Sequence, residues 1–126
     1  MSVEIWIRPD SGSSGSLYRI SNASGDEIYV DLGLSLVSGL QDEEWSHVVF
    51  SMAMHIEEDT KVYLNGVEVN SFSYAVGFSD TNGNTHLIGY DYTGFIYQVC
   101  LYNLTLEGPF SYREDPCPAG YCTTCP

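Results

Sequence analysis

The sequence predicts an all-β, antiparallel sandwich, and three observations support this prediction. Apolar and polar residues alternate with a period of two in several short segments, which is typical of strands that bury one face. Clusters of turn-forming residues separate these segments at intervals of roughly 8 to 12 residues. No segment has the apolar spacing of an amphipathic helix of useful length.

The first half of the chain contains short expected strands separated by turns. Pro9 ends the first of them, because proline has no N–H to donate to a sheet. Residues 11–16 consist of Ser and Gly and predict a surface loop. Either Gly33 or Gly39 is expected to turn the chain into the last strand of this half, which would form a hairpin with its predecessor. The expected strands are residues 2–8, 17–21, 27–32 and 35–37.

The second half contains the longest uninterrupted strand candidate and the clearest turn. Residues 45–54 carry apolar side chains on both faces, which predicts a central strand that is buried on both sides. Asn65-Gly66 is a dipeptide that accepts positive φ at both central positions of a type I′ turn, so residues 61–69 should form a hairpin. The remaining expected strands are residues 71–78, 86–90 and 94–106, with a loop at 79–84.

Three segments together resemble the laminin G-like, concanavalin A-like jelly-roll family, at the order and spacing typical of that family. They are residues 45–50, residues 62–67 and the closing segment, in which the matching positions are Gly94, Phe95, Ile96, Val99, Leu101, Tyr102, Asn103 and Leu106. Trp6, Arg8 and Pro9 resemble an early strand of the same family. The resemblance implies a jelly roll over residues 1–108. Because one or two further strands usually precede this early strand and pair with the closing strand, we expect a piece of a longer modular protein.

The charge of the chain excludes some partners. Lys and Arg total 4 against 17 Asp and Glu, which gives a net charge of −13. Such a surface repels phosphate backbones and anionic membranes, so nucleic acid is not an expected partner. No apolar run approaches the roughly 20 residues of a membrane-spanning helix, so membrane insertion of this segment is not expected either. Its 126 residues suit one domain with a real core.

Residues 109–126 are predicted to be a cysteine-rich tail. The segment resembles the start of a furin-like or growth-factor-receptor-type repeat, which implies an extracellular or cell-surface protein. We expect disulfides rather than a zinc site, because one cysteine lies in a strand far from the others and Pro and Gly flank the rest. Four cysteines allow three pairings, and all of them stay open. The cysteines are Cys100, Cys117, Cys122 and Cys125, and the two glycosylation sequons begin at Asn22 and Asn103.

The sequence does not predict an enzyme. Glycosidases with this fold carry a strand with Glu-x-Asp-x-x-Glu or a close variant, and the nearest approach, Glu57-Glu58-Asp59, has Val62 in place of the last carboxylate. The serine motif of hydrolases is also missing from the sequence. His47 follows Trp45 where the family usually has a histidine, and we interpret it as a structural, hydrogen-bonded imidazole.

Calcium is the one cofactor that we consider, because many domains of the laminin G-like family that this chain resembles hold this ion at the rim of the sandwich. Oxygen-bearing side chains in a flexible loop suit a hard cation. The candidate ligands are Asp80, Asn82, Asn84 and Asp91, whose spacing imitates an EF-hand loop. Thr85 replaces the glycine that an EF-hand requires, so a rim site is the interpretation that we keep.

Tyrosines near the end of the chain form a candidate ligand surface. Ten tyrosines are present, and this residue suits polar contact surfaces because its ring loses little entropy on binding. Tyr90 and Tyr92, with Asn84 beside them, could form a platform for a glycan or a protein.

These features predict two alternative functions. The first is a non-enzymatic extracellular module for recognition or adhesion, with an extracellular protein or a glycan as its partner. The second is a structural repeat of a filament, coat or matrix, whose partners are identical neighbouring subunits that cover exposed strand edges.

Overall fold

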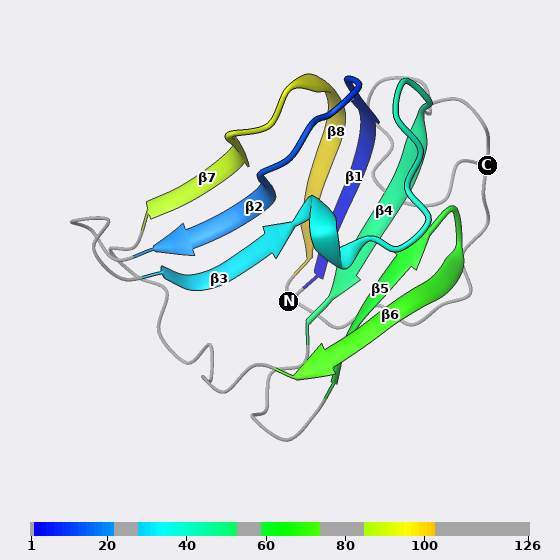
Figure 1. Cartoon of the computed structure of the whole chain (residues 1–126). Helices are drawn as coiled ribbons and strands as arrows, with labels where there is room; N and C mark the ends of the chain where they lie inside the picture. Colours follow the sequence, from blue (N-terminus) through cyan, green and yellow to red (C-terminus); the bar gives the residue numbers. More distant parts are fainter. Residues whose placement is uncertain (1, 22–27, 53–58, 74–84, 103–126) are drawn as a thin grey trace.

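The computed structural model describes residues 2–21, 28–52, 59–73 and 85–102, and these form two antiparallel sheets (Figure 1). A 3-10 helix, η1, is the one helical element among them. The elements are β1 (Ser2–Pro9), β2 (Ser16–Ser21), β3 (Ile28–Gly33), η1 (Leu34–Leu36), β4 (Ser46–Ser51), β5 (Asp59–Leu64), β6 (Val67–Ser73), β7 (Thr85–Tyr90) and β8 (Gly94–Tyr102).

The chain crosses repeatedly between the two sheets. The larger sheet has the strand order β6-β5-β4-β1-β8, and the smaller has the order β3-β2-β7. The predicted central position of the strand after Trp45 is confirmed, because β4 lies in the middle of the five-stranded sheet. β1 pairs with β4 on one side and with the closing strand β8 on the other. The first and last described strands are therefore neighbours.

The core lies between the two sheets, and every second residue along the strands of the larger sheet points into it. In β1, the three residues that point inward are Val3, Ile5 and Ile7, and none of them is accessible to solvent. They meet the apolar residues of the smaller sheet, which include Leu17, Ile20 and Leu32. Removing this much apolar surface from water is the main driving force for the fold.

The outer face of the five-stranded sheet is buried as well. Trp6, His47 and Val49 point away from the core between the sheets, and all three are buried. All six residues of β4 are buried. The predicted burial of this strand on both sides is confirmed.

Residues of positive φ shape the β5–β6 turn and the strand β8. Asn65 and Gly66 have φ angles of 52° and 88°, which confirms the predicted hairpin turn between β5 and β6. Gln98 has a φ of 50° and lies at a register shift, where Ile5 pairs with Val99 but Trp6 pairs with Tyr97. This irregularity is a β-bulge, which adds one residue to β8.

Two predictions about the strands are wrong. Residues 35–37 are not a hairpin partner of β3, because the chain after Gly33 closes into η1, with the Val37 N–H donating to the Leu34 carbonyl at 3.0 Å. The longest described strand is β8, with nine residues, whereas β4 has six. Apolar composition indicated burial correctly but did not show where the sheet pairing begins and ends.

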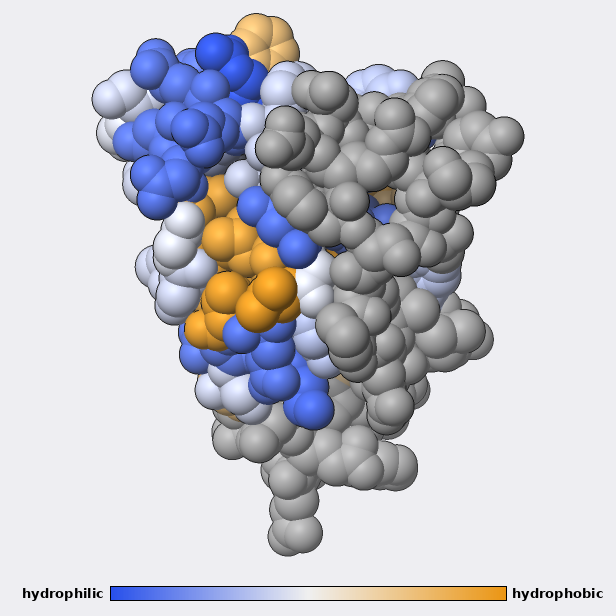
Figure 2. All heavy atoms as spheres, turned by 90° about the vertical axis from the view of Figure 1, so that its right-hand side faces the viewer, coloured by the Kyte–Doolittle hydropathy of each residue, from blue (hydrophilic) through white to orange (hydrophobic). Residues whose placement is uncertain are grey.

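Apolar residues also gather at one place on the surface. Figure 2 shows an apolar patch on the side of the molecule that carries β6, with hydrophilic residues above and below it. On β6 itself, the Val67 side chain is 64% exposed.

Candidate functional site

A pocket of about 480 Å³ lies at the rim of the sandwich, between the loop that joins β1 to β2 and the segment that joins η1 to β4. We call it the rim pocket. Its lining is part aliphatic and part polar. The lining residues are Pro9, Ser13, Ser14, Gly15, Leu34, Ser35, Val37, Gly39, Leu40 and Asp42.

Backbone hydrogen bonds hold the walls of the rim pocket together. The Leu34 N–H donates to the Gly15 carbonyl at 3.0 Å, and the Glu43 N–H donates to the Pro9 carbonyl at 2.7 Å. The β1–β2 loop is also bonded to the segment between β7 and β8, where the Thr93 N–H donates to Ser13 Oγ at 3.1 Å. The β1–β2 loop, which the Ser and Gly of residues 11–16 predicted to be a surface loop, is therefore tied to neighbours on two sides.

Gly15 is required where this loop passes the turn between β7 and β8. Its φ is +93°, and a Cβ at this position would lie 2.4 Å from the Tyr90 carbonyl oxygen and 2.5 Å from that of Asp91. No side chain can be accommodated against fixed backbone at such distances. The glycine therefore brings the floor of the rim pocket into direct contact with the β7–β8 turn.

Among the described residues, Asp42 is the only ionisable one that lines the rim pocket. Its Oδ2 accepts one hydrogen bond, a long one of 3.3 Å from the Gly12 N–H. Glu43 and Glu44 follow it in the sequence and are exposed. The pocket thus combines aliphatic walls, serine hydroxyls and one carboxylate at a negatively charged edge.

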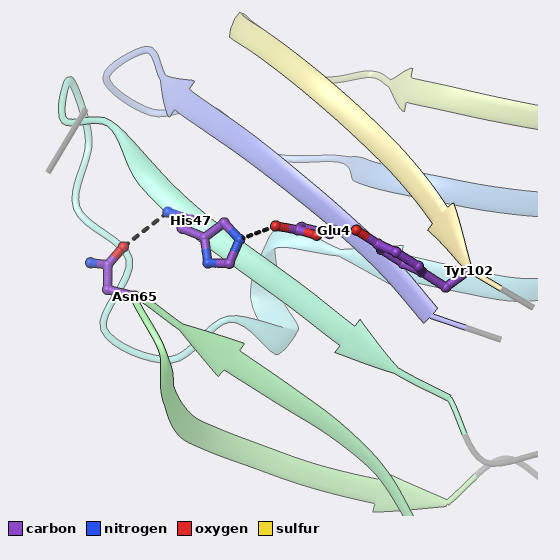
Figure 3. Close-up of polar contacts among 4 residues, drawn as sticks. All are labelled: Glu4, His47, Asn65 and Tyr102. Carbon is purple, nitrogen blue, oxygen red and sulfur yellow. Dashed lines mark hydrogen bonds and ion pairs between the residues drawn. The ribbon is translucent and has the colours of Figure 1, made fainter. Parts of the chain in front are cut away.

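A second polar cluster lies on the outer face of the five-stranded sheet (Figure 3). Glu4 of β1 is 5% exposed, and its two carboxylate oxygens have separate partners: His47 Nε2 at 2.8 Å from Oε1, and the Tyr102 hydroxyl, which donates to Oε2 at 2.6 Å. The backbone N–H of His47 donates to Asn65 Oδ1 at 2.9 Å. The cluster joins β1, β4, β8 and the β5–β6 turn.

The geometry of this cluster indicates which atom donates each hydrogen bond. His47 is 3% exposed, and its Nδ1 is buried without a hydrogen-bond partner, so the Nε2–H is the proton that the neutral ring carries and donates to Glu4. Burial and the hydrogen bond to Glu4 raise the pKa of the Tyr102 phenol above its ordinary value. The predicted structural role of His47 agrees with this arrangement, in which the ring links two strands.

The two described tyrosines of the predicted ligand surface differ in their exposure and contacts. Tyr90 is 42% exposed, and the Arg19 guanidinium lies 4.0 Å from the centre of its ring. Tyr92 packs against the core, and its hydroxyl donates to the Phe95 carbonyl at 3.0 Å. Asn84 lies outside the described residues, so the surface as a whole stays a prediction.

The calcium prediction rests mostly on residues outside the described part of the chain, namely Asp80, Asn82 and Asn84. Asp91 is described and occupies the turn between β7 and β8 with a φ of 54°. Among the described residues, no three His, Cys, Asp or Glu side chains lie together as a metal site. The described part of the chain alone therefore does not supply a full set of ligands.

Most of the predicted disulfide and glycosylation positions lie outside the described residues. Cys100 is described: it is buried in β8, opposite Glu4, and is disulfide-bonded. Its partner is not among the described residues, so the pairing stays a prediction. The positions outside the description are Cys117, Cys122, Cys125, Asn22 and Asn103.

Sequence reasoning missed the rim pocket altogether. Its residues come from two segments that are far apart in the chain, and the Ser and Gly of residues 11–16 look like an ordinary linker. One signal was available: Leu34, Val37 and Leu40 are apolar residues that recur among Ser and Gly. Such a run indicates that the loop packs against something.

These features define an antiparallel β-sandwich with a pocket at its rim. The chain matches a laminin G family, described as the concanavalin A-like lectin/glucanases superfamily, over residues 34–108, which is more than half of its length. It therefore belongs to this family, and the predicted fold is confirmed. Comparison with curated proteins gave no match, and neither did comparison with solved structures. In the described part of the chain, no helix is long and apolar enough to span a membrane.

Proposed function

We propose that this domain is a non-enzymatic recognition module that binds an extracellular protein or a glycan in the rim pocket. The observation that supports the proposal is the pocket itself, with aliphatic walls, three serines and one carboxylate on loops that are tied together by backbone hydrogen bonds. A preformed, half-open pocket loses little conformational entropy when a ligand enters it.

The proposal includes an extracellular setting. The sequons at Asn22 and Asn103 and the cysteine-rich tail support it. Calcium is a further part of the proposal, as an ion that would stabilise the loops around Asp91.

The test is a binding screen against purified extracellular proteins and glycans with a pocket-filling variant. Ser35→Trp places an indole at an exposed lining position, so it should abolish binding of any ligand that uses the pocket. Ser38→Trp is the matched control, because Ser38 is also exposed but does not line the pocket. If no ligand binds the wild type, or if every bound ligand tolerates Ser35→Trp, the rim pocket is not the recognition site.

Exposed apolar side chains on several strands favour a second candidate, a structural repeat that packs against identical copies. Exposed apolar side chains leave water when identical copies pack together, and this burial favours association. The residues are Ile28, Val67, Ile88, Phe95 and Leu101. Light scattering after size exclusion, in calcium and again after chelation, separates the two candidates: the recognition module should be monomeric in both, and a stable assembly would favour the repeat.

A further inference from the structure

We propose that the rim pocket binds a primary ammonium group on an aliphatic stem, as a lysine side chain on the surface of a partner protein presents it. This inference rests on the proposed function and names the ligand chemistry of the same site. It follows from the charge, the wall chemistry and the surroundings of the pocket.

The carboxylate of Asp42 has no cation of its own in the described part of the chain. Arg8 donates from Nε to the Glu43 carbonyl at 3.1 Å and lies over the Phe95 ring, and Arg19 forms an ion pair with Asp31. Asp42 accepts only the 3.3 Å bond from Gly12. A carboxylate at the edge of a pocket with spare acceptor capacity favours a cationic ligand.

The walls of the rim pocket suit an aliphatic stem better than a sugar ring. The apolar lining consists of Pro9, Leu34, Val37 and Leu40, and none of the ten lining residues is aromatic. Sugars generally pack their apolar faces on aromatic rings, and here there is no such platform. A chain of methylene groups packs against aliphatic side chains while its charged end stays near water.

The polar groups of the pocket suit an ammonium better than a guanidinium. Oδ2 of Asp42 already accepts from Gly12, so a planar fork that uses both oxygens finds fewer free lone pairs here than at an unoccupied carboxylate. An ammonium is compact and has three donors that can point in different directions. Serine hydroxyls on both walls, from Ser14 and Ser35, can accept the donors that Asp42 does not.

The surroundings indicate that a protein rather than a free amine supplies this group. Exposed Asp10, Glu43 and Glu44 lie next in the chain to the lining residues Pro9 and Asp42, and the chain carries a net charge of −13. Such a field accelerates encounter with a basic surface and repels an acidic one. A basic protein contacts the surrounding acids as well as the pocket, whereas a small amine contacts the pocket alone.

The experiment titrates the intact chain with three blocked peptides of the same length, which carry lysine, acetyl-lysine or arginine at the centre of a Gly-Ser sequence. We expect the lysine peptide to bind at least tenfold more tightly than the other two. Asp42→Asn should weaken lysine binding at least tenfold, because the amide oxygen keeps the Gly12 bond but loses the charge. Glu44→Gln removes the same charge outside the pocket and should change binding less than threefold.

The outcomes separate this inference from the function on which it rests. Equal binding of the lysine and acetyl-lysine peptides, or equal losses from Asp42→Asn and Glu44→Gln, would overturn the lysine assignment. If a neutral glycan binds and Ser35→Trp abolishes that binding, the recognition function stands and the ligand is a glycan instead. If free butylamine binds as tightly as the lysine peptide, a small amine and not a protein is the ligand.

Discussion

Tyr102 donates a 2.6 Å hydrogen bond to a carboxylate that is almost entirely buried. Hydrogen bonds to charged groups contribute about 1.5 to 3 kcal/mol each, more than those between neutral groups. Tyr102→Phe should therefore lower the free energy of unfolding by about that amount, as measured by urea denaturation. The unfolding transition should remain cooperative.

The control for this variant is Tyr97→Phe. Tyr97 lies on the same strand, and its hydroxyl has no hydrogen bond to a described residue, so losing that oxygen should cost much less. Equal losses in the two variants would show that the Glu4 cluster contributes nothing beyond ring packing.

Tyr92 should make the free energy of unfolding fall as the pH rises through the alkaline range. Burial, and then the negative charge of Asp10, raise its pKa from 10.0 to about 12. The folded state thus keeps the phenol proton more tightly than the unfolded state does, and this contribution is fully present below pH 10 and is lost as pH rises toward 12. The Tyr92→Phe variant should lose less stability than the wild type over this interval, in urea unfolding followed by circular dichroism. Parallel losses in both proteins would contradict the assignment.

The β5–β6 hairpin depends on two residues of positive φ. Gly66 has a φ of 88°, and an alanine there would adopt a left-handed conformation at a cost of about 1 to 2 kcal/mol. Gly66→Ala should lower the free energy of unfolding by this amount, measured in urea. Gly33→Ala is the control, because Gly33 has an ordinary φ of −77° and its added Cβ would come no closer than 3.4 Å to a neighbour. If both variants lose the same stability, the turn conformation is not the cause.

Strands were predictable from the sequence where the apolar pattern and a turn signal agreed. The alternation up to Pro9 and the Asn65-Gly66 dipeptide each depend on local chemistry, and the structure has β1 and the hairpin at these places. The bulge at Gln98 was not predictable, because nothing in the sequence marks a glutamine for positive φ. The η1 turn and the rim pocket arise from contacts between distant segments, which local patterns do not contain.

At the scale of the whole molecule, the charge of −13 opposes compaction. Because salt screens repulsion between exposed charges, a moderate increase in ionic strength should raise the thermal midpoint. Differential scanning calorimetry in a sodium chloride series measures this shift. A variant with Asp42, Glu43 and Glu44 changed to amides should respond less to salt. A midpoint that falls with added salt would show that attractive ion pairs, such as Arg19 with Asp31, outweigh the repulsion.

The pairing of β1 with β8 determines when the sheet can be completed during synthesis. The Glu4–Tyr102 contact spans 98 positions of the chain, so β1 must wait for β8 before this side of its pairing and its buried carboxylate are satisfied. Contacts of such high sequence separation slow folding, because the entropy of closing the loop is lost before the contact forms. Until β8 leaves the ribosome, the edge of β1 that β8 later covers is open to pairing with a neighbouring nascent chain.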